Sequence, residues 1–194
     1  MKEFSAQQKE IIRAAIELIA ESGIQSVTIK KLSQKIGIAE SAIYRHFENK
    51  LEILLGILSQ FRSSKMEALE YIQAADATEI EQLQMVFSER FKQFTRNPAI
   101  TAVIFSEEIF QNDKRLADEV YAIMNSSLKM ILSIIQRGQQ NKSIRSDISA
   151  DQLSLIIIGA LRLLVVRWRL SSFSFDLTKE GEKLWLSIRQ MIRA

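Results

Sequence analysis

The chain has 194 residues, of which 47% are apolar and 25% charged, a balance that excludes a disordered protein and allows one small module plus one larger one. It has no cysteine and a single histidine, so the residues needed for zinc sites, thiol nucleophiles and serine–histidine–aspartate catalysis are missing. The formal net charge is +3, and residues 26–50 alone carry a local excess of this size, which favours an anionic partner there.

These observations disfavour an enzyme, although carboxylate or lysine catalysis stays possible in principle, and they predict no metal and no cofactor. The amino terminus, "MKEFSAQQKE", is charged and lacks the apolar core of a signal peptide, so we expect a cytoplasmic protein.

Helical periodicity dominates the sequence. Pro98 is the single proline, and apolar residues recur mostly at spacings of three and four, which predicts an all-α protein. The first helix is expected to open at Ser5, because Gln8 follows at the spacing of a capping box, and to end at Gly23.

Two short helices follow the first one. Thr28 is expected to cap a helix that ends at Gly37, and a third helix would turn Ala39, Ile43 and Phe47 inward. Helices this short are not stable alone, so they must pack on each other and on the first helix. The sequence therefore predicts a three-helix, helix-turn-helix domain over residues 1–50.

A long helix from Asn49 links this domain to the remainder of the chain. Residues 51–194 are expected to form a larger helical domain. Its further helices are predicted near residues 79–96, 99–111, 114–140, 150–171 and 178–193.

The third short helix is suited to enter the major groove of DNA. With successive residues about 100° apart and Ile43 inward, Ser41 and Arg45 point outward, and an arginine there can bind guanine O6 and N7. Neighbouring polar side chains are suited to phosphate oxygens. The predicted DNA contacts are Thr28, Lys30, Glu40, Ser41, Ala42, Tyr44, Arg45, His46 and Lys50.

Three of these contacts have alternative interpretations. Glu40 could accept a hydrogen bond from cytosine N4 or only complement the helix dipole. Tyr44 could fill the edge of the core, and His46 could pack at the seam between helices instead of contacting a phosphate.

The segment "TIKKLSQKIGIAESAIYRHFENKLEIL" resembles the DNA-binding domain of the TetR/AcrR family of bacterial transcriptional regulators, over residues from about 10 to 58. The resemblance implies DNA contacts by Lys30, Ser41, Tyr44, Arg45, His46 and Lys50. This chain has Ala39 where many members have a capping serine and Ala42 where many have threonine, so it lacks the hydroxyl groups that these members have at both positions.

The segment 153–168, "LSLIIIGALRLLVVRW", is apolar nearly all round but too short and interrupted to span a membrane. A helix of this kind must be buried on more than one side, which a homodimer through a four-helix bundle would achieve. The last two helices also resemble the dimerisation helices of the family, and two-fold symmetry implies a pseudo-palindromic operator. The predicted interface residues are Leu155, Ile158, Gly159, Leu163, Val166, Trp185, Ile188 and Ile192.

The resemblance also implies a pocket for a small, mostly apolar or amphipathic effector. Candidate lining residues are Phe87, Phe91, Phe94, Phe105, Phe110, Tyr121, Met124 and Arg162. A stripe of Phe and Met at helical spacing is equally compatible with plain core. Arg162, within an apolar helix, needs an acidic partner, a carbonyl group or an acidic ligand.

Two functions are compatible with these features. The first is a dimeric, DNA-binding transcriptional regulator of the ligand-responsive repressor type. The alternative is a DNA-binding protein of the same fold whose larger domain binds a protein partner, as nucleoid-occlusion members of the family do.

Overall fold

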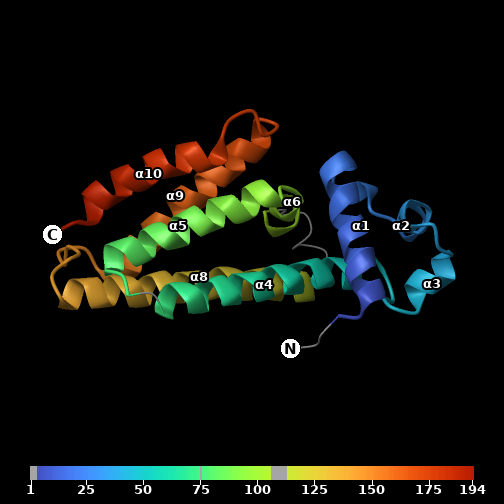
Figure 1. Cartoon of the computed structure of the whole chain (residues 1–194), viewed down its shortest axis with the longest axis horizontal. Helices are drawn as coiled ribbons and strands as arrows, with labels where there is room; N and C mark the ends of the chain where they lie inside the picture. The colour runs from blue at the N-terminus through green and yellow to red at the C-terminus, as the bar shows by residue number, and fades with distance from the viewer. Residues whose placement is uncertain (1–3, 75, 106–112) are drawn as a thin grey trace. The chain divides into compact units, whose positions relative to one another are not determined.

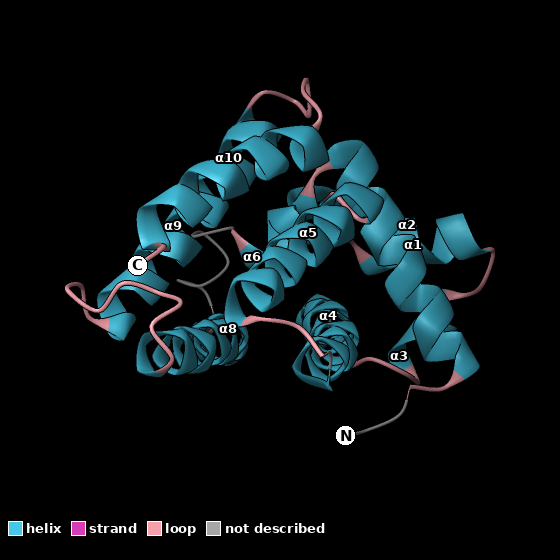
Figure 2. Ribbon diagram, turned by 60° about the vertical axis from the view of Figure 1, so that its left-hand side comes forward, coloured by secondary structure: helices cyan, strands magenta, loops and turns pink. Residues whose placement is uncertain are grey.

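The computed structural model describes residues 4–74, 76–105 and 113–194, and its helices are labelled in chain order in Figure 1. Within these ranges all regular secondary structure is helical, apart from one isolated bridge between Ile144 and Arg193 (Figure 2). The expected all-α fold is confirmed. The elements are α1 (Ala6–Ser22), η1 (Ile24–Ser26), α2 (Ile29–Ile36), α3 (Glu40–Tyr44), α4 (Lys50–Ala74), α5 (Glu79–Arg96), α6 (Ala99–Ile104), α8 (Lys114–Gln140), α9 (Ala150–Leu170) and α10 (Leu177–Ile192).

Local signals define the first helix ends as expected. The Ser5 hydroxyl accepts from the backbone N–H of Gln8, whose side chain accepts from the backbone N–H of Ser5, so α1 begins with a capping box. Gly23 and Gly37 end α1 and α2 with φ of 76° and 77°, values that favour glycine.

The later helices agree with the predicted ranges to different degrees. The bounds of α5 and α8 coincide with the predicted 79–96 and 114–140. The predicted helix 99–111 is confirmed only over α6, because residues 106–111 lie outside the described residues.

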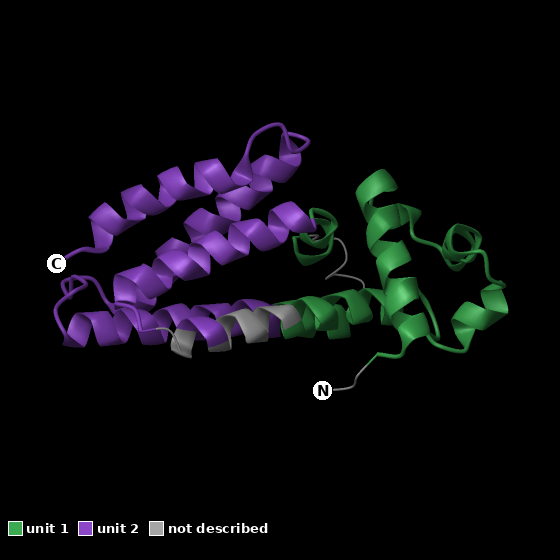
Figure 3. Ribbon diagram, in the orientation of Figure 1, with its two compact units in different colours: residues 1–63, 98–120 green, residues 64–97, 121–194 purple. Residues whose placement is uncertain are grey.

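The chain forms two compact units (Figure 3). Unit 1 comprises Met1–Ser63 and Pro98–Val120, and unit 2 comprises Ser64–Asn97 and Tyr121–Ala194. Unit 1 extends beyond the helix-turn-helix segment because α6 packs against α1 and the first part of α4 belongs to the same core. The functional division at residue 50 stays a prediction.

In unit 1, apolar side chains of the short helices converge on α1. Ile12 of α1, Leu32 of α2 and Ile43 of α3 are completely buried. A Cβ on Gly56 of α4 would stand 3.0 Å from the Cδ1 atom of Ile12, so the start of α4 approaches α1 closely. Burial of Ile43 sets the rotation of α3 and turns its polar residues outward.

In unit 2, α5 packs against α10 and α9. Phe87 and Phe91 are both 1% exposed, and their rings meet edge-on with centroids 5.9 Å apart. The ring of Phe87 also lies 5.3 Å from that of Trp185 on α10. Gly181 allows α10 to approach Phe91 of α5 closely, because a Cβ at this position would stand 2.3 Å from Cδ2 of Phe91.

We expect Gly181→Ala to lower the free energy of unfolding by about 1–3 kcal/mol, because overpacking against Phe91 outweighs the helix propensity gained from alanine. Urea unfolding measures this change. Adding Phe91→Leu should make the loss smaller than the sum of the two single losses, since leucine relieves the clash. Strictly additive losses would contradict the proposed contact.

Candidate DNA-binding site

The helix-turn-helix segment is built by α2, the turn at Gly37 and α3. Thr28 caps α2, its hydroxyl oxygen accepting from the backbone N–H of Lys31 at 3.2 Å. A hydroxyl that accepts one bond still has its own proton to donate, so capping by Thr28 is compatible with a phosphate contact. The turn continues past Tyr44, since the N–H groups of His46 and Phe47 both donate to the carbonyl of Ile43.

The outward face of α3 is polar. Glu40, Ser41 and Arg45 are exposed, whereas Ala42 and His46 are half-buried. Tyr44 is 53% exposed, so its ring does not fill the edge of the core. Ala39 provides no side-chain cap for α3. Glu40 is the acidic residue of the first helical turn, where its charge complements the helix dipole. The outward orientation of Ser41 and Arg45 is as expected, and their contact with DNA stays a prediction.

Lys50 has a structural contact that the sequence did not reveal. Its ammonium donates to the backbone carbonyl of Ile24 at 2.8 Å and thereby ties the start of α4 to η1. Burial lowers the pKa of Lys50 below its ordinary value. One of its three donors is used in this way, and its phosphate contact stays a prediction.

Two further contacts connect α1 with the helix-turn-helix segment, which comprises α2, the turn at Gly37 and α3 and is called the reading segment from here on. Gln8, which completes the α1 capping box, donates from its side chain to the backbone carbonyl of His46 at 3.4 Å. Lys35 of α2 bonds to Glu21 at 2.8 Å and lies 3.4 Å from Glu17, and the bond to Glu21 raises the pKa of Lys35. Lys35 therefore connects α2 with α1 through ion pairs.

The residues expected to line an effector pocket fall into several groups. Phe87, Phe91 and Phe94 are buried on α5. Met124 and Arg162 are brought together, with 3.6 Å between the sulfur and a guanidinium nitrogen.

The other three residues of that set are placed differently. Tyr121 is 69% exposed on α8, because this helix turns the position to solvent within the protomer, and its place in an effector pocket stays a prediction. Phe105 ends α6 in unit 1, and Phe110 lies outside the described residues.

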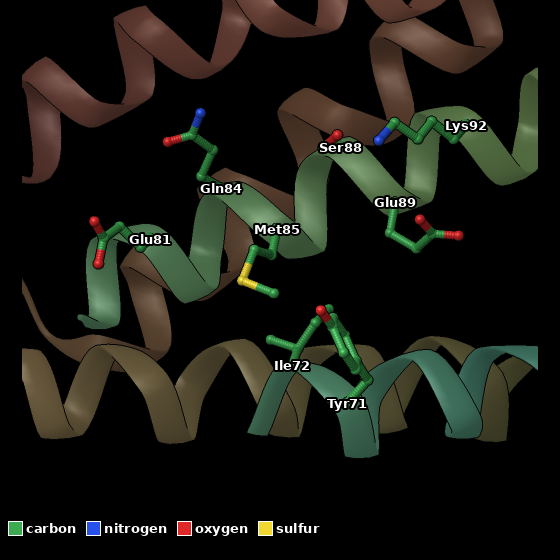
Figure 4. Close-up of a pocket in the computed structure, with 8 residues that line it drawn as sticks. All are labelled: Tyr71, Ile72, Glu81, Gln84, Met85, Ser88, Glu89 and Lys92. Carbon is green, nitrogen blue, oxygen red and sulfur yellow. The ribbon is translucent and has the colours of Figure 1, made fainter. Parts of the chain in front are cut away.

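Unit 2 contains a hollow of about 580 Å³ between α4 and α5 that the sequence did not indicate (Figure 4). In Figure 4, Met85 points toward α4, and Ile72 and Tyr71 point toward α5. The hollow is lined by Tyr71, Ile72, Glu81, Gln84, Met85, Ser88, Glu89 and Lys92. Spacings of three and four along α5 could have suggested this second face, opposite the Phe stripe.

Arg90 is a half-buried cation of α5. Its guanidinium carbon lies 5.9 Å from the centre of the Phe94 ring, and one of its nitrogens donates to the Gln93 side chain at 2.9 Å. Burial lowers the pKa of Arg90 to about 10, which leaves it protonated at neutral pH.

The residues expected at the dimer interface differ in how exposed their side chains are. Leu155 and Leu163 are 65% and 62% exposed on α9, and a Cβ placed on Gly159 would meet no described atom within 4 Å apart from its chain neighbours and the backbone of its own helix. These residues form one stripe at i, i+4 and i+8. Ile158 and Val166 are half-buried.

The predicted interface residues of α10 require a correction. Trp185, Ile188 and Ile192 are at most 3% exposed within a single protomer. They belong to the core of unit 2, where α10 packs against α5 and Trp185 contacts Phe87. Their periodicity correctly indicated a buried face, but the chain's own α5 covers it.

The comparison with known families decides the class of this protein. Residues 11–57 match the family described as "Bacterial regulatory proteins, tetR family", and residues 57–190 match "YsiA-like protein, C-terminal region". The chain belongs to the TetR family. It is a DNA-binding transcriptional regulator, and regulators of this family act as ligand-responsive repressors that bind DNA as dimers.

Curated TetR relatives match along nearly the whole chain. A fatty acid metabolism regulator protein of Bacillus subtilis (strain 168) is 26% identical over 177 residues, 91% of each chain. Nucleoid occlusion factor SlmA of Vibrio vulnificus (strain YJ016) is 20% identical over 190 residues, 97% of each chain.

Solved structures share the fold of this TetR regulator. FadR of Bacillus subtilis in complex with stearoyl-CoA has a TM-score of 0.80 at 24% identity, covering 93% of this chain and 96% of that one. FadR of Bacillus halodurans has a TM-score of 0.82 at 21% identity, covering 97% of each. In the part of the chain that the structure describes, no helix is long and apolar enough to cross a membrane.

Proposed function

We propose that this TetR-family regulator is a dimeric repressor that binds a pseudo-palindromic operator and is released from it by a fatty-acyl thioester. The observation that carries the effector class is the 26% identity, over 91% of both chains, to a fatty acid metabolism regulator, and the thioester is suggested by FadR of Bacillus subtilis, which shares the fold and is in complex with stearoyl-CoA. Release then follows from a higher affinity of the effector for the conformation that does not fit the operator.

The reading face supports the DNA-binding half of this proposal. The exposed Arg45 and Ser41 of α3 would face base edges, and Tyr44 lies beside them. Lys30 at the start of α2 would contact the phosphate backbone.

The exposed stripe of α9 supports the dimer. Leu155, Gly159 and Leu163 present apolar atoms and open space to solvent within a single protomer. An exposed apolar stripe of this kind favours burial against a second copy, with Gly159 allowing close approach of the partner helix.

The aromatic interior of unit 2 supports an apolar effector. An acyl chain needs an apolar lining, which Phe87, Phe91 and Phe94 would provide after local rearrangement. The guanidinium of Arg162, next to Met124, would face the polar end of the molecule.

The relatives named as nucleoid occlusion factors support the alternative of a protein partner, but their identity to this chain, 19–24%, is below the 26% of the fatty acid metabolism regulator. Addition of stearoyl-CoA separates the two functions. We expect it to weaken binding to a duplex selected by the protein from a random pool by about 10- to 100-fold, as measured by fluorescence anisotropy.

Free coenzyme A at the same concentration is the control and should leave the affinity unchanged. Tight binding to the selected duplex that does not respond to acyl chains of any length would contradict the proposed effector class. It would leave the DNA-binding function intact and favour a different signal.

A further inference from the structure

Two helices pass from unit 1 into unit 2. Unit 1 ends at Ser63 within α4 and at Val120 within α8, so each helix has its first part in unit 1 and its remainder in unit 2 (Figure 3). The first turn of α4 directly follows the reading segment. A change in unit 2 that displaces either helix can therefore reach the reading segment through unit 1.

Within unit 1, two ion pairs join the first parts of these helices. Arg115 of α8 lies 2.7 Å from Glu52 of α4, and Arg62 of α4 lies 3.1 Å from Glu119 of α8. The acid is on α4 in the first pair and on α8 in the second. Because the signs alternate, a shift of one helix along the other would break both attractions.

The first of these pairs is anchored on both sides. Asp113 accepts from the backbone N–H of Arg115 at 2.8 Å and lies 3.4 Å from its guanidinium, which orients the side chain at the start of α8. Asp113 and Glu52 together raise the pKa of Arg115. On α4, the backbone N–H of Glu52 donates to the side chain of Asn49 at 3.1 Å, immediately behind the reading segment.

We propose that the Glu52–Arg115 and Arg62–Glu119 ion pairs form a clamp between α4 and α8. By fixing the start of α4, the clamp orients the reading segment that precedes it and so sets the operator affinity of the dimer. This proposal adds a regulatory contact to the proposed function, and it depends on the proposed binding of the operator. Glu52 and Arg115 are positioning residues, because they hold the first turn of α4 and neither is among the proposed DNA contacts.

The magnitude of the effect follows from exposure. The side chains of Arg115 and Glu52 are 56% and 31% exposed, so each pair is screened by solvent and biases an equilibrium only modestly. Such a bias is sufficient for regulation, because the two reading segments of a dimer must both be oriented for the operator. Opening the clamp therefore lowers the operator affinity once in each protomer.

The test compares Glu52→Gln and Arg115→Gln with the parent chain on the duplex that the parent selects. We expect both variants to bind this duplex about two- to tenfold more weakly and to bind unrelated duplex DNA with unchanged affinity, because non-specific binding does not require a fixed head orientation. The double variant should bind no more weakly than either single variant, since the clamp is already open.

Charge alone predicts a different pattern. Removing the negative Glu52 would strengthen all DNA binding and removing the positive Arg115 would weaken it, so effects of opposite sign would overturn the clamp. Lys114→Gln and Asp118→Asn are matched controls, because they break an ion pair of 2.6 Å that lies entirely within α8. These controls should keep the parent's specific affinity, and an equal loss in them would also overturn the proposal.

Thermal unfolding of every variant identifies losses caused by misfolding, and the clamp predicts melting temperatures within a few degrees of the parent, about the change expected for an exposed pair. Failure of the parent to select any duplex would overturn the proposed operator binding together with the clamp. Selection by the parent combined with charge-like behaviour of the variants would overturn the clamp alone.

Discussion

A Leu163→Asp variant is expected to be monomeric and to lose specific operator binding. Leu163 is 62% exposed in the protomer, so the aspartate does not disturb the core of unit 2, but it would bury a charge in the apolar interface with a second copy. We expect the dissociation constant of the dimer to rise at least about 100-fold, equivalent to about 3 kcal/mol. Sedimentation velocity at micromolar concentration measures this change.

Tyr121→Asp is the matched control for this experiment, because Tyr121 is an equally exposed large side chain of unit 2 that lies on α8. It should remain dimeric and keep its operator affinity. A Leu163→Asp protein that stays dimeric would show that α9 does not form the interface. Trp185→Ala, by contrast, should destabilise the protomer itself, since Trp185 is buried against Phe87.

The second large effect is expected for Arg45→Ala. Arg45 is exposed on the reading face, so its removal should leave the melting temperature unchanged and reduce discrimination between the selected duplex and variants at one base pair by about 1–3 kcal/mol. Binding to each duplex, measured by anisotropy at several salt concentrations, gives this value.

Lys30→Ala is the appropriate comparison for Arg45→Ala. We expect it to weaken binding to all duplexes alike and to reduce the slope of log affinity against log salt by about 1, because a phosphate contact reads no sequence. Lys50 is less suitable, since its removal also leaves the carbonyl of Ile24 without its partner. Identical behaviour of the Arg45 and Lys30 variants would contradict the groove assignment.

The reading face was accessible from the sequence because its determinants are local. Capping at Thr28, the turn at Gly37 and the inward Ile43 together fix the rotation of a short helix, and the structure has all three. The DNA contacts themselves stay predictions. The second role of Lys50 could not be seen, because its partner Ile24 lies 26 residues away in the chain.

The effector and dimer regions show the limit of helical periodicity. The stripes of α5 and α10 correctly indicated apolar faces, but Phe87 and Trp185 cover each other, whereas Leu163 is left uncovered. Periodicity specifies the direction in which a side chain points and contains no information about which helix lies there.

The sequence by itself determined the helical class, most helix ends and the polar face of α3, since caps, glycines and apolar spacing act within a few residues of each other. Only the tertiary structure decided which apolar faces are used inside the protomer, where the hollow between α4 and α5 lies, and that Glu52 meets Arg115. These features depend on pairings between residues distant in the chain, and such pairings follow from the packing of whole helices and not from local propensity.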